Sequence, residues 1–101
     1  MPKKLPPIHA GQVLKNVLED AGLSANAAAL ALRIPANRLT AIINGQRGIS
    51  ADTAMRLGRF FGTSAEMWMN LQAKYDLHKA EDEFAEKVER EVQPFAVGAE
   101  R

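Results

Sequence analysis

The residues best suited to recognition chemistry lie together between positions 36 and 44. If this segment is a helix, Leu39, Ile42 and Ile43 share one face at the i, i+3, i+4 spacing of a buried stripe. The opposite face then carries amide, guanidinium, hydroxyl and methyl groups, from Ala36, Asn37, Arg38, Thr40, Ala41 and Asn44. Arginine can pair bidentately with guanine and asparagine with adenine, while a methyl group can meet the methyl of thymine. This face is therefore predicted to read base edges in a DNA major groove.

Two short helices joined by a tight turn, at about 24–32 and 35–44, are expected to position that face. Ser24 is a good N-cap, and the alanines that follow favour helix and allow another helix to approach closely. Pro35 cannot continue the first helix but suits the start of the second, and Gly45 ends it. The apolar anchors of the first helix and the turn are expected to be Leu30, Leu32 and Ile34.

The charge distribution separates DNA binding from the alternative, a merely solvated polar face on a small bundle. Between positions 24 and 59 there are five arginines and a single acidic residue, Asp52. This imbalance favours a polyanionic partner. Asn44 and Arg47, beyond the far end of the helix, are better placed for phosphates, which position the protein without specifying sequence.

The remaining elements are expected to support this pair. A helix over about 10–21, closed by Gly22, carries an apolar stripe that is predicted to be core. Ser50 is predicted to cap a fourth helix with Asp52 in its first turn, and Arg56 and Arg59 facing out. Residues 63–66, Thr-Ser-Ala-Glu, match a capping box at the start of a fifth helix.

The fifth helix has more apolar surface than a small bundle usually buries. Its large apolar residues, which we predict to form a homodimer interface, are Met67, Trp68, Met69, Leu71 and Tyr75. The alternative is that Met67 and Leu71 belong to the core of the bundle, which leaves Trp68, Met69 or Tyr75 for the dimer contact. A two-fold dimer would place two recognition helices on half-sites about 34 Å apart, one turn of DNA.

A further amphipathic helix is predicted from about Leu77 to Val92, where Pro94 prevents continuation. Its apolar positions are Ala80, Phe84, Val88 and Val92, and its other side is mostly acidic. Residues 1–77 have a net charge of +4, from nine Lys/Arg and five Asp/Glu, whereas residues 78–101 have −3, from four and seven. The sequence leaves three possibilities open for this helix: packing on the body, extending the dimer, or docking on a basic partner.

Length and composition bound the rest. The 101 residues are expected to form a basic DNA-binding domain (10–77), preceded by an extended lead (1–9) and followed by an acidic helix and tail (78–101). No apolar run approaches the ~20 residues that span a bilayer, and the absence of cysteine fits the cytoplasm. Two isolated histidines, His9 and His78, make no metal site, and no nucleophile–base pair or cofactor loop is present. We therefore expect no catalysis, no metal and no cofactor.

Three segments carry a resemblance to a known family: Ile8-His9-Ala10-Gly11, Asn44-Gly45-Gln46-Arg47-Gly48-Ile49-Ser50 and Phe61-Gly62-Thr63-Ser64-Ala65-Glu66-Met67-Trp68. The chain resembles the xenobiotic-response-element and phage-repressor class of helix-turn-helix proteins, and most closely the HigA (also VapI) antitoxins. The resemblance covers about residues 6–75. It implies an all-α, lambda-repressor-like domain of five to six helices that binds a double-stranded operator.

The same resemblance implies a partner: a HigB-type toxin, a ribosome-dependent mRNA endoribonuclease whose operon the antitoxin represses. The alternative is an orphan regulator of the same fold without a toxin. The resemblance also gives His9 a structural role at the entry to the first helix. Two positions depart from the family pattern: Ala25 stands where many relatives have a phosphate-contacting Gln, and Arg33 where the turn usually has Gly. We expect Asn26 to take over phosphate contacts and Arg33 to add one.

Overall fold

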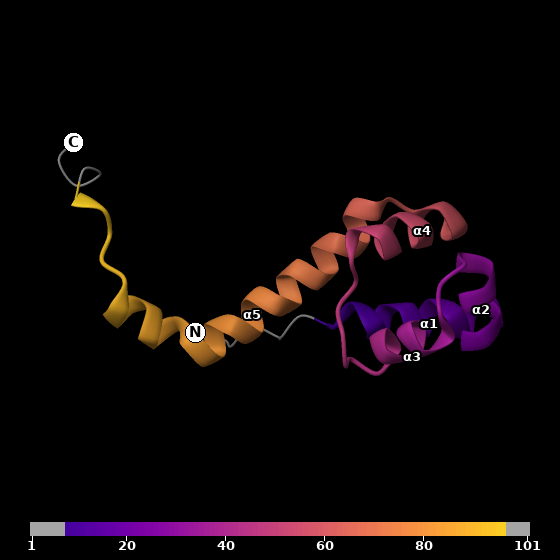
Figure 1. The fold of residues 1–101 in the computed structure, drawn as a ribbon, viewed down its shortest axis with the longest axis horizontal. Helices are drawn as coiled ribbons and strands as arrows, with labels where there is room; N and C mark the ends of the chain where they lie inside the picture. Colours follow the sequence, from indigo (N-terminus) through magenta and orange to yellow (C-terminus); the bar gives the residue numbers. More distant parts are fainter. Residues whose placement is uncertain (1–7, 97–101) are drawn as a thin grey trace.

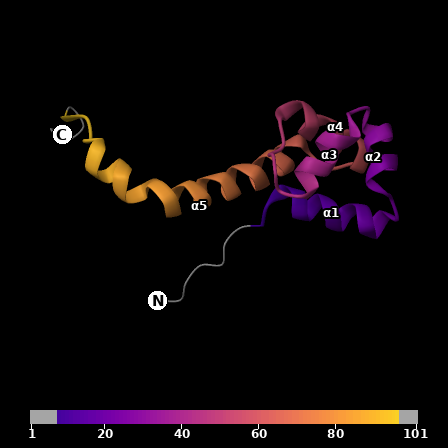
Figure 2. The same cartoon turned by 60° about the horizontal axis from the view of Figure 1, so that its bottom comes forward.

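The computed structural model describes residues 8–96, which form five helices and no strand. The predicted all-α fold with a helix-turn-helix is thereby confirmed. The helices are α1 (Ala10–Ala21), α2 (Ala25–Leu32), α3 (Ala36–Ile43), α4 (Ala51–Phe61) and α5 (Ala65–Glu91). Helices α1 to α4 form a body at one end of the molecule, and α5 starts in this body and extends well beyond it (Figures 1 and 2).

Side-chain caps fix where most of these helices begin. The Nδ1 atom of His9 accepts a hydrogen bond from the Gly11 N–H at 2.8 Å, which confirms the structural role expected for this histidine. Ser24 and Ser50 cap α2 and α4 as predicted, accepting from the third residue beyond each. The capping-box prediction is one residue off: Ser64, not Thr63, caps α5. The Thr63 hydroxyl instead accepts from the Trp68 indole N–H at 2.9 Å.

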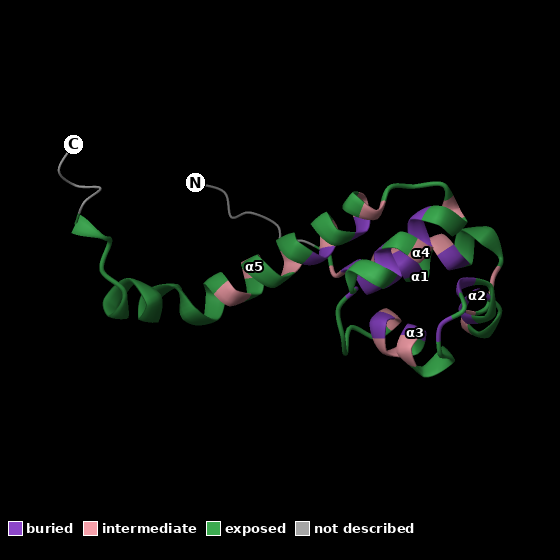
Figure 3. Ribbon diagram, turned by 45° about the horizontal axis from the view of Figure 1, so that its top comes forward, coloured by how far each residue is buried: buried purple, intermediate pink, exposed green. Residues whose placement is uncertain are grey.

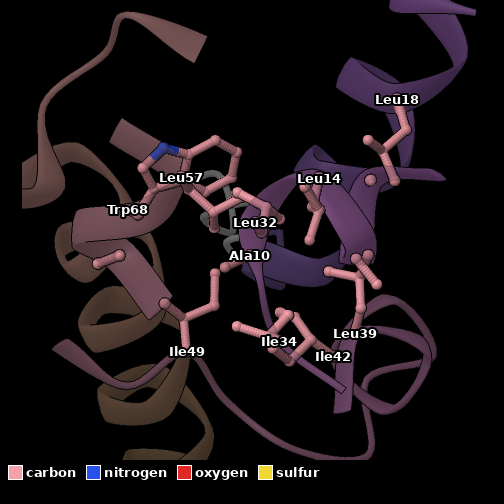
Figure 4. Close-up of a cluster of buried hydrophobic side chains, with 13 residues drawn as sticks. Ala10, Leu14, Leu18, Leu32, Ile34, Leu39, Ile42, Ile49, Leu57 and Trp68 are labelled. Atoms are coloured by element: carbon pink, nitrogen blue, oxygen red, sulfur yellow. The ribbon is translucent and has the colours of Figure 1, made fainter. Parts of the chain in front are cut away.

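The core lies where all five helices converge (Figure 4). Its largest fully buried apolar side chains are Trp68, Leu14, Leu39, Ile42 and Leu57. Close approach between α1 and α3 depends on Gly11, because a Cβ atom there would collide with the backbone carbonyl of Ile42. The apolar stripes predicted for the first and third helices therefore meet each other directly.

One predicted anchor of α2 is wrong. Leu32 and Ile34 are buried, but Leu30 is 76% exposed. Helix α2 packs through its small residues, because Ala28, Ala29 and Leu32 share one face and Leu30 lies outside that face. Helix α2 therefore carries one large apolar side chain, Leu30, that is not buried in the core.

Helix α5 is one continuous helix of 27 residues rather than two helices in succession. It contains no glycine or proline that would interrupt it. Every residue from Glu81 to Glu91 is exposed, and this part does not pack on the body of the described chain (Figure 3). Of the three possibilities that the sequence left open for this segment, packing on the body is therefore excluded within the described chain.

Candidate nucleic-acid interface

The polar face of α3 is exposed, and buried side chains on the opposite face hold the helix in place. Leu39 and Ile42 are buried at 0% and 1% exposure, which fixes the helix from beneath. Asn37 and Thr40 are exposed, while Arg38 is half-buried. The structure thus confirms the predicted separation of an inner and an outer face, and the base-reading roles of the outer residues stay predictions.

A hollow between α2 and α3 brings two predicted contact residues together. Asn26 near the start of α2 and Ala36 at the start of α3 both line it, along with the exposed Leu30. Pro35 provides no side-chain cap for α3, so the first-turn amides of α3 gain no side-chain partner. Open helix amides favour an anion, which is what a DNA phosphate supplies.

The loop from Gly45 to Ile49, which connects α3 to α4, presents Arg47 to solvent. Gly45 has φ 76°, the left-handed conformation that was predicted for the end of this helix. The Gln46 N–H donates to the Ala41 carbonyl at 2.8 Å, and the Ile49 N–H donates to the Gln72 side-chain oxygen at 3.2 Å. Gln72 was not identified from the sequence. The signal that identifies it is its spacing, because it lies one helical turn after Trp68 on the buried face of α5.

Arg33 occupies a different place from the other predicted contact residues. It lines a second hollow with Arg56, Arg59 and Phe60, between α2 and α4. Arg56 was expected to face out, and its guanidinium donates to the Leu32 carbonyl and to the Asp52 carboxylate, each at 3.0 Å. The residues that line this second hollow come from α2, the turn after it and α4, whereas those that line the first come from α2, the turn and α3. A DNA contact by Arg33 therefore stays a prediction, and Arg33 does not join the hollow that contains Asn26 and Ala36.

Arg33 has φ 61° and is the only non-glycine residue with a positive φ among residues 8–96. This conformation costs a residue with a Cβ roughly 1–2 kcal/mol, and glycine avoids that strain. Part of the gain is offset because glycine has more conformational freedom in the unfolded chain. We expect Arg33→Gly to raise the free energy of unfolding by about 0.5–1 kcal/mol, measured by urea denaturation. Arg33→Ala is the control because it removes the same side chain and keeps the strained backbone. Equal stability of the two variants would show that the backbone strain contributes nothing.

The five predicted dimer residues differ in how much of their surface remains available to a partner. The prediction is wrong for Trp68, whose side chain is 0% exposed in the single chain and has no surface left for a partner. Met67 and Leu71 are half-buried against the core. Tyr75 is half-buried and its ring meets the His9 ring edge-on, at 4.8 Å between centroids, while Met69 is 36% exposed. Large apolar side chains that are more exposed than these lie farther along the chain, at Leu77, Phe84 and Val88 of α5 and at Val92 directly after it.

Residues 8–96 contain no group of three or more His, Cys, Asp or Glu side chains that could hold a metal ion. None of the helices in this range has the length and apolarity to cross a membrane.

The fold and the outer face of α3 define a helix-turn-helix protein, and the chain matches the Helix-turn-helix family model over residues 14–68. It is similar to an addiction module antidote protein of the HigA family from Coxiella burnetii, with 48% identity, a TM-score of 0.82, and 90% of this chain and 100% of that one covered. Antitoxin HigA of Pseudomonas aeruginosa, solved with the higBA promoter, gives 44% identity and a TM-score of 0.83 over 88% of this chain and 98% of that one. Virulence-associated protein I of Dichelobacter nodosus is 47% identical over 79% of this chain and 75% of the relative.

The chain belongs to the HigA antitoxin family of helix-turn-helix proteins. The resemblance inferred from the three sequence segments is thereby confirmed.

Proposed function

We propose that this chain is a cytoplasmic, non-enzymatic repressor that binds operator DNA of its own operon through α3. The observation that carries the proposal is the outer face of α3, where Asn37 and Thr40 are exposed and Arg38 half-buried on a helix fixed by Leu39 and Ile42. Phosphate contacts would come from Asn26, Asn44 and Arg47. The structure of the P. aeruginosa relative with the higBA promoter supports this assignment.

A gel-shift on DNA from upstream of the gene, with random duplex as competitor and salt varied, tests this function. We expect retardation that survives competitor, with two protected half-sites related by two-fold symmetry. Binding no tighter than to random duplex would reject the repressor and leave the helix-turn-helix as a scaffold for protein contacts.

We propose further that the chain neutralises an mRNA-cleaving toxin of the HigB type. Support comes from the relatives, one of which is described as an addiction module antidote and another as an antitoxin. The test is to search the DNA next to the gene for a small basic reading frame and to express that frame alone and with this chain, and the absence of such a frame would count against the proposal. Growth arrest that this chain relieves would support the antitoxin role, and arrest without relief would support an orphan regulator.

We propose that the repressor is a homodimer formed through the outer part of α5. Beyond Leu77 this helix extends about 20 Å, at 1.5 Å per residue, and carries Ala80, Phe84 and Val88 along one side. An exposed apolar stripe of this kind, rimmed by glutamates, is typical of a protein interface. It replaces Trp68 as the expected anchor.

The double variant Phe84→Asp/Val88→Asp should shift the solution mass from about twice the 11.0 kDa chain to the single chain. Burying two carboxylates at an apolar contact is expected to weaken association by about 3 kcal/mol or more. Sedimentation equilibrium measures the mass, and Glu86→Ala on the same exposed helix is the control. A double variant that keeps the mass of the dimer would place the interface elsewhere.

A further inference from the structure

This inference rests on the proposed DNA binding and concerns the loop that carries Arg47. Helix α5 holds this loop through one buried polar side chain, Gln72, which is 7% exposed. Its Oε1 atom accepts from the Ile49 N–H at 3.2 Å, and its Nε2 atom donates to the Asp76 carboxylate at 2.9 Å. The two partners fix the orientation of the amide, because an N–H can only donate and a carboxylate can only accept.

The loop backbone lies directly on this amide. A Cβ atom on Gly48 would come within 2.9 Å of Cδ and Nε2 of Gln72, so a residue larger than glycine at this position would displace the amide. The side chain of Ile49 is itself buried at 4% exposure. Gln72 therefore holds the loop immediately after Arg47 and Gly48.

The other end of the loop is held by α3, where the Gln46 N–H donates to the Ala41 carbonyl at 2.8 Å. Arg47 thus lies between two residues whose N–H groups are hydrogen-bonded, Gln46 directly before it and Ile49 two positions after it. Its own side chain is exposed to solvent. A hydrogen bond to a phosphate weakens steeply when its distance and angle depart from the ideal values. The position from which Arg47 can reach a phosphate therefore depends on the hydrogen bonds at both ends of the loop.

We propose that Gln72 is a positioning residue for DNA-backbone binding: it sets the loop of residues 45–49 so that Arg47 meets a phosphate. Asp76 supports Gln72 by accepting a hydrogen bond from Nε2, which keeps the oxygen of the Gln72 amide directed toward the Ile49 N–H. The alternative is that Gln72 only satisfies a buried N–H group and contributes to stability alone. The two roles differ in what they do to the salt dependence of binding, because the number of phosphate contacts sets its slope.

The test compares DNA affinity and its salt slope for the wild type, Arg47→Ala, Gln72→Leu and the double variant. Leucine keeps most of the volume of Gln72 and removes its hydrogen bonds. We expect each single variant to lose about fivefold to tenfold in affinity and to lower the slope by about one. We expect the double variant to bind no more weakly than Arg47→Ala, because Gln72 acts through that arginine.

Several results would overturn the proposal: a wild-type slope for Gln72→Leu or for Arg47→Ala, or losses that multiply in the double variant. Asn70→Ala, an exposed change on the same helix, is the control and should leave the slope unchanged. If Gln72→Leu does not fold, Gly48→Ala takes its place, because the added Cβ displaces the amide. A wild-type slope there would also overturn the proposal.

Failure of the repressor function is distinguishable from failure of this inference. Slopes can be compared on random duplex as well as on operator, since phosphate contacts form on both. A wild type without operator preference rejects the repressor, whereas an operator-specific protein whose Gln72→Leu slope is unchanged rejects only the role of Gln72.

Discussion

Replacing Trp68 with alanine should strongly destabilise the fold rather than separate a dimer. The indole is fully buried and its N–H donates to Thr63, so the change leaves a large cavity and removes a hydrogen bond. Losses of about 3–5 kcal/mol are typical for Trp→Ala in a core. A domain of this size has only about 5–15 kcal/mol of stability to lose. Urea denaturation followed by circular dichroism measures the effect.

Met69→Ala is the matched control for this prediction. Met69 is the next residue, is 36% exposed, and should cost less than about 1 kcal/mol. The loss of stability in Trp68→Phe should lie between those of the two alanine variants, because phenylalanine keeps a buried ring but loses the hydrogen bond to Thr63. A folded, stable and monomeric Trp68→Ala protein would contradict the burial of this residue and restore it as a dimer contact.

Replacing Arg38 with alanine should weaken operator binding by about 1–3 kcal/mol and relax the preference at one base position. The reason is geometric: Arg38 lies on the outer side of α3, next to the buried Leu39 that holds the helix in place. Affinity for the operator and for a panel of single-base variants is the measurement.

Arg59→Ala is the control for Arg38, since it removes the same charge from the hollow between α2 and α4. It should change operator affinity little and leave the preference at every position intact. An Arg38→Ala loss that is equal for operator and random duplex would show that Arg38 contacts phosphate and does not read a base.

The sequence alone determined helices α1 to α4, the region where α5 begins, most of the helix caps and the two faces of α3, but not that α5 runs without a break to Glu91. These features depend on residues within one or two helical turns, such as Ser24 and Ala27 or Leu39 and Ile42, so local spacing is enough to predict them. The family followed from three short segments of sequence for a similar reason, since each lies within one helix end or loop.

Only the tertiary structure decided which apolar side chains are used up in the core. Spacing places Trp68 and Met69 on one helix, but burial depends on where α4 and the core meet α5, so the indole is enclosed and its neighbour is not. The same reason explains Leu30, which is apolar yet exposed because α2 packs through its alanines. The role of Gln72 was hidden because its partner Ile49 lies 23 residues away, a separation that only folding closes.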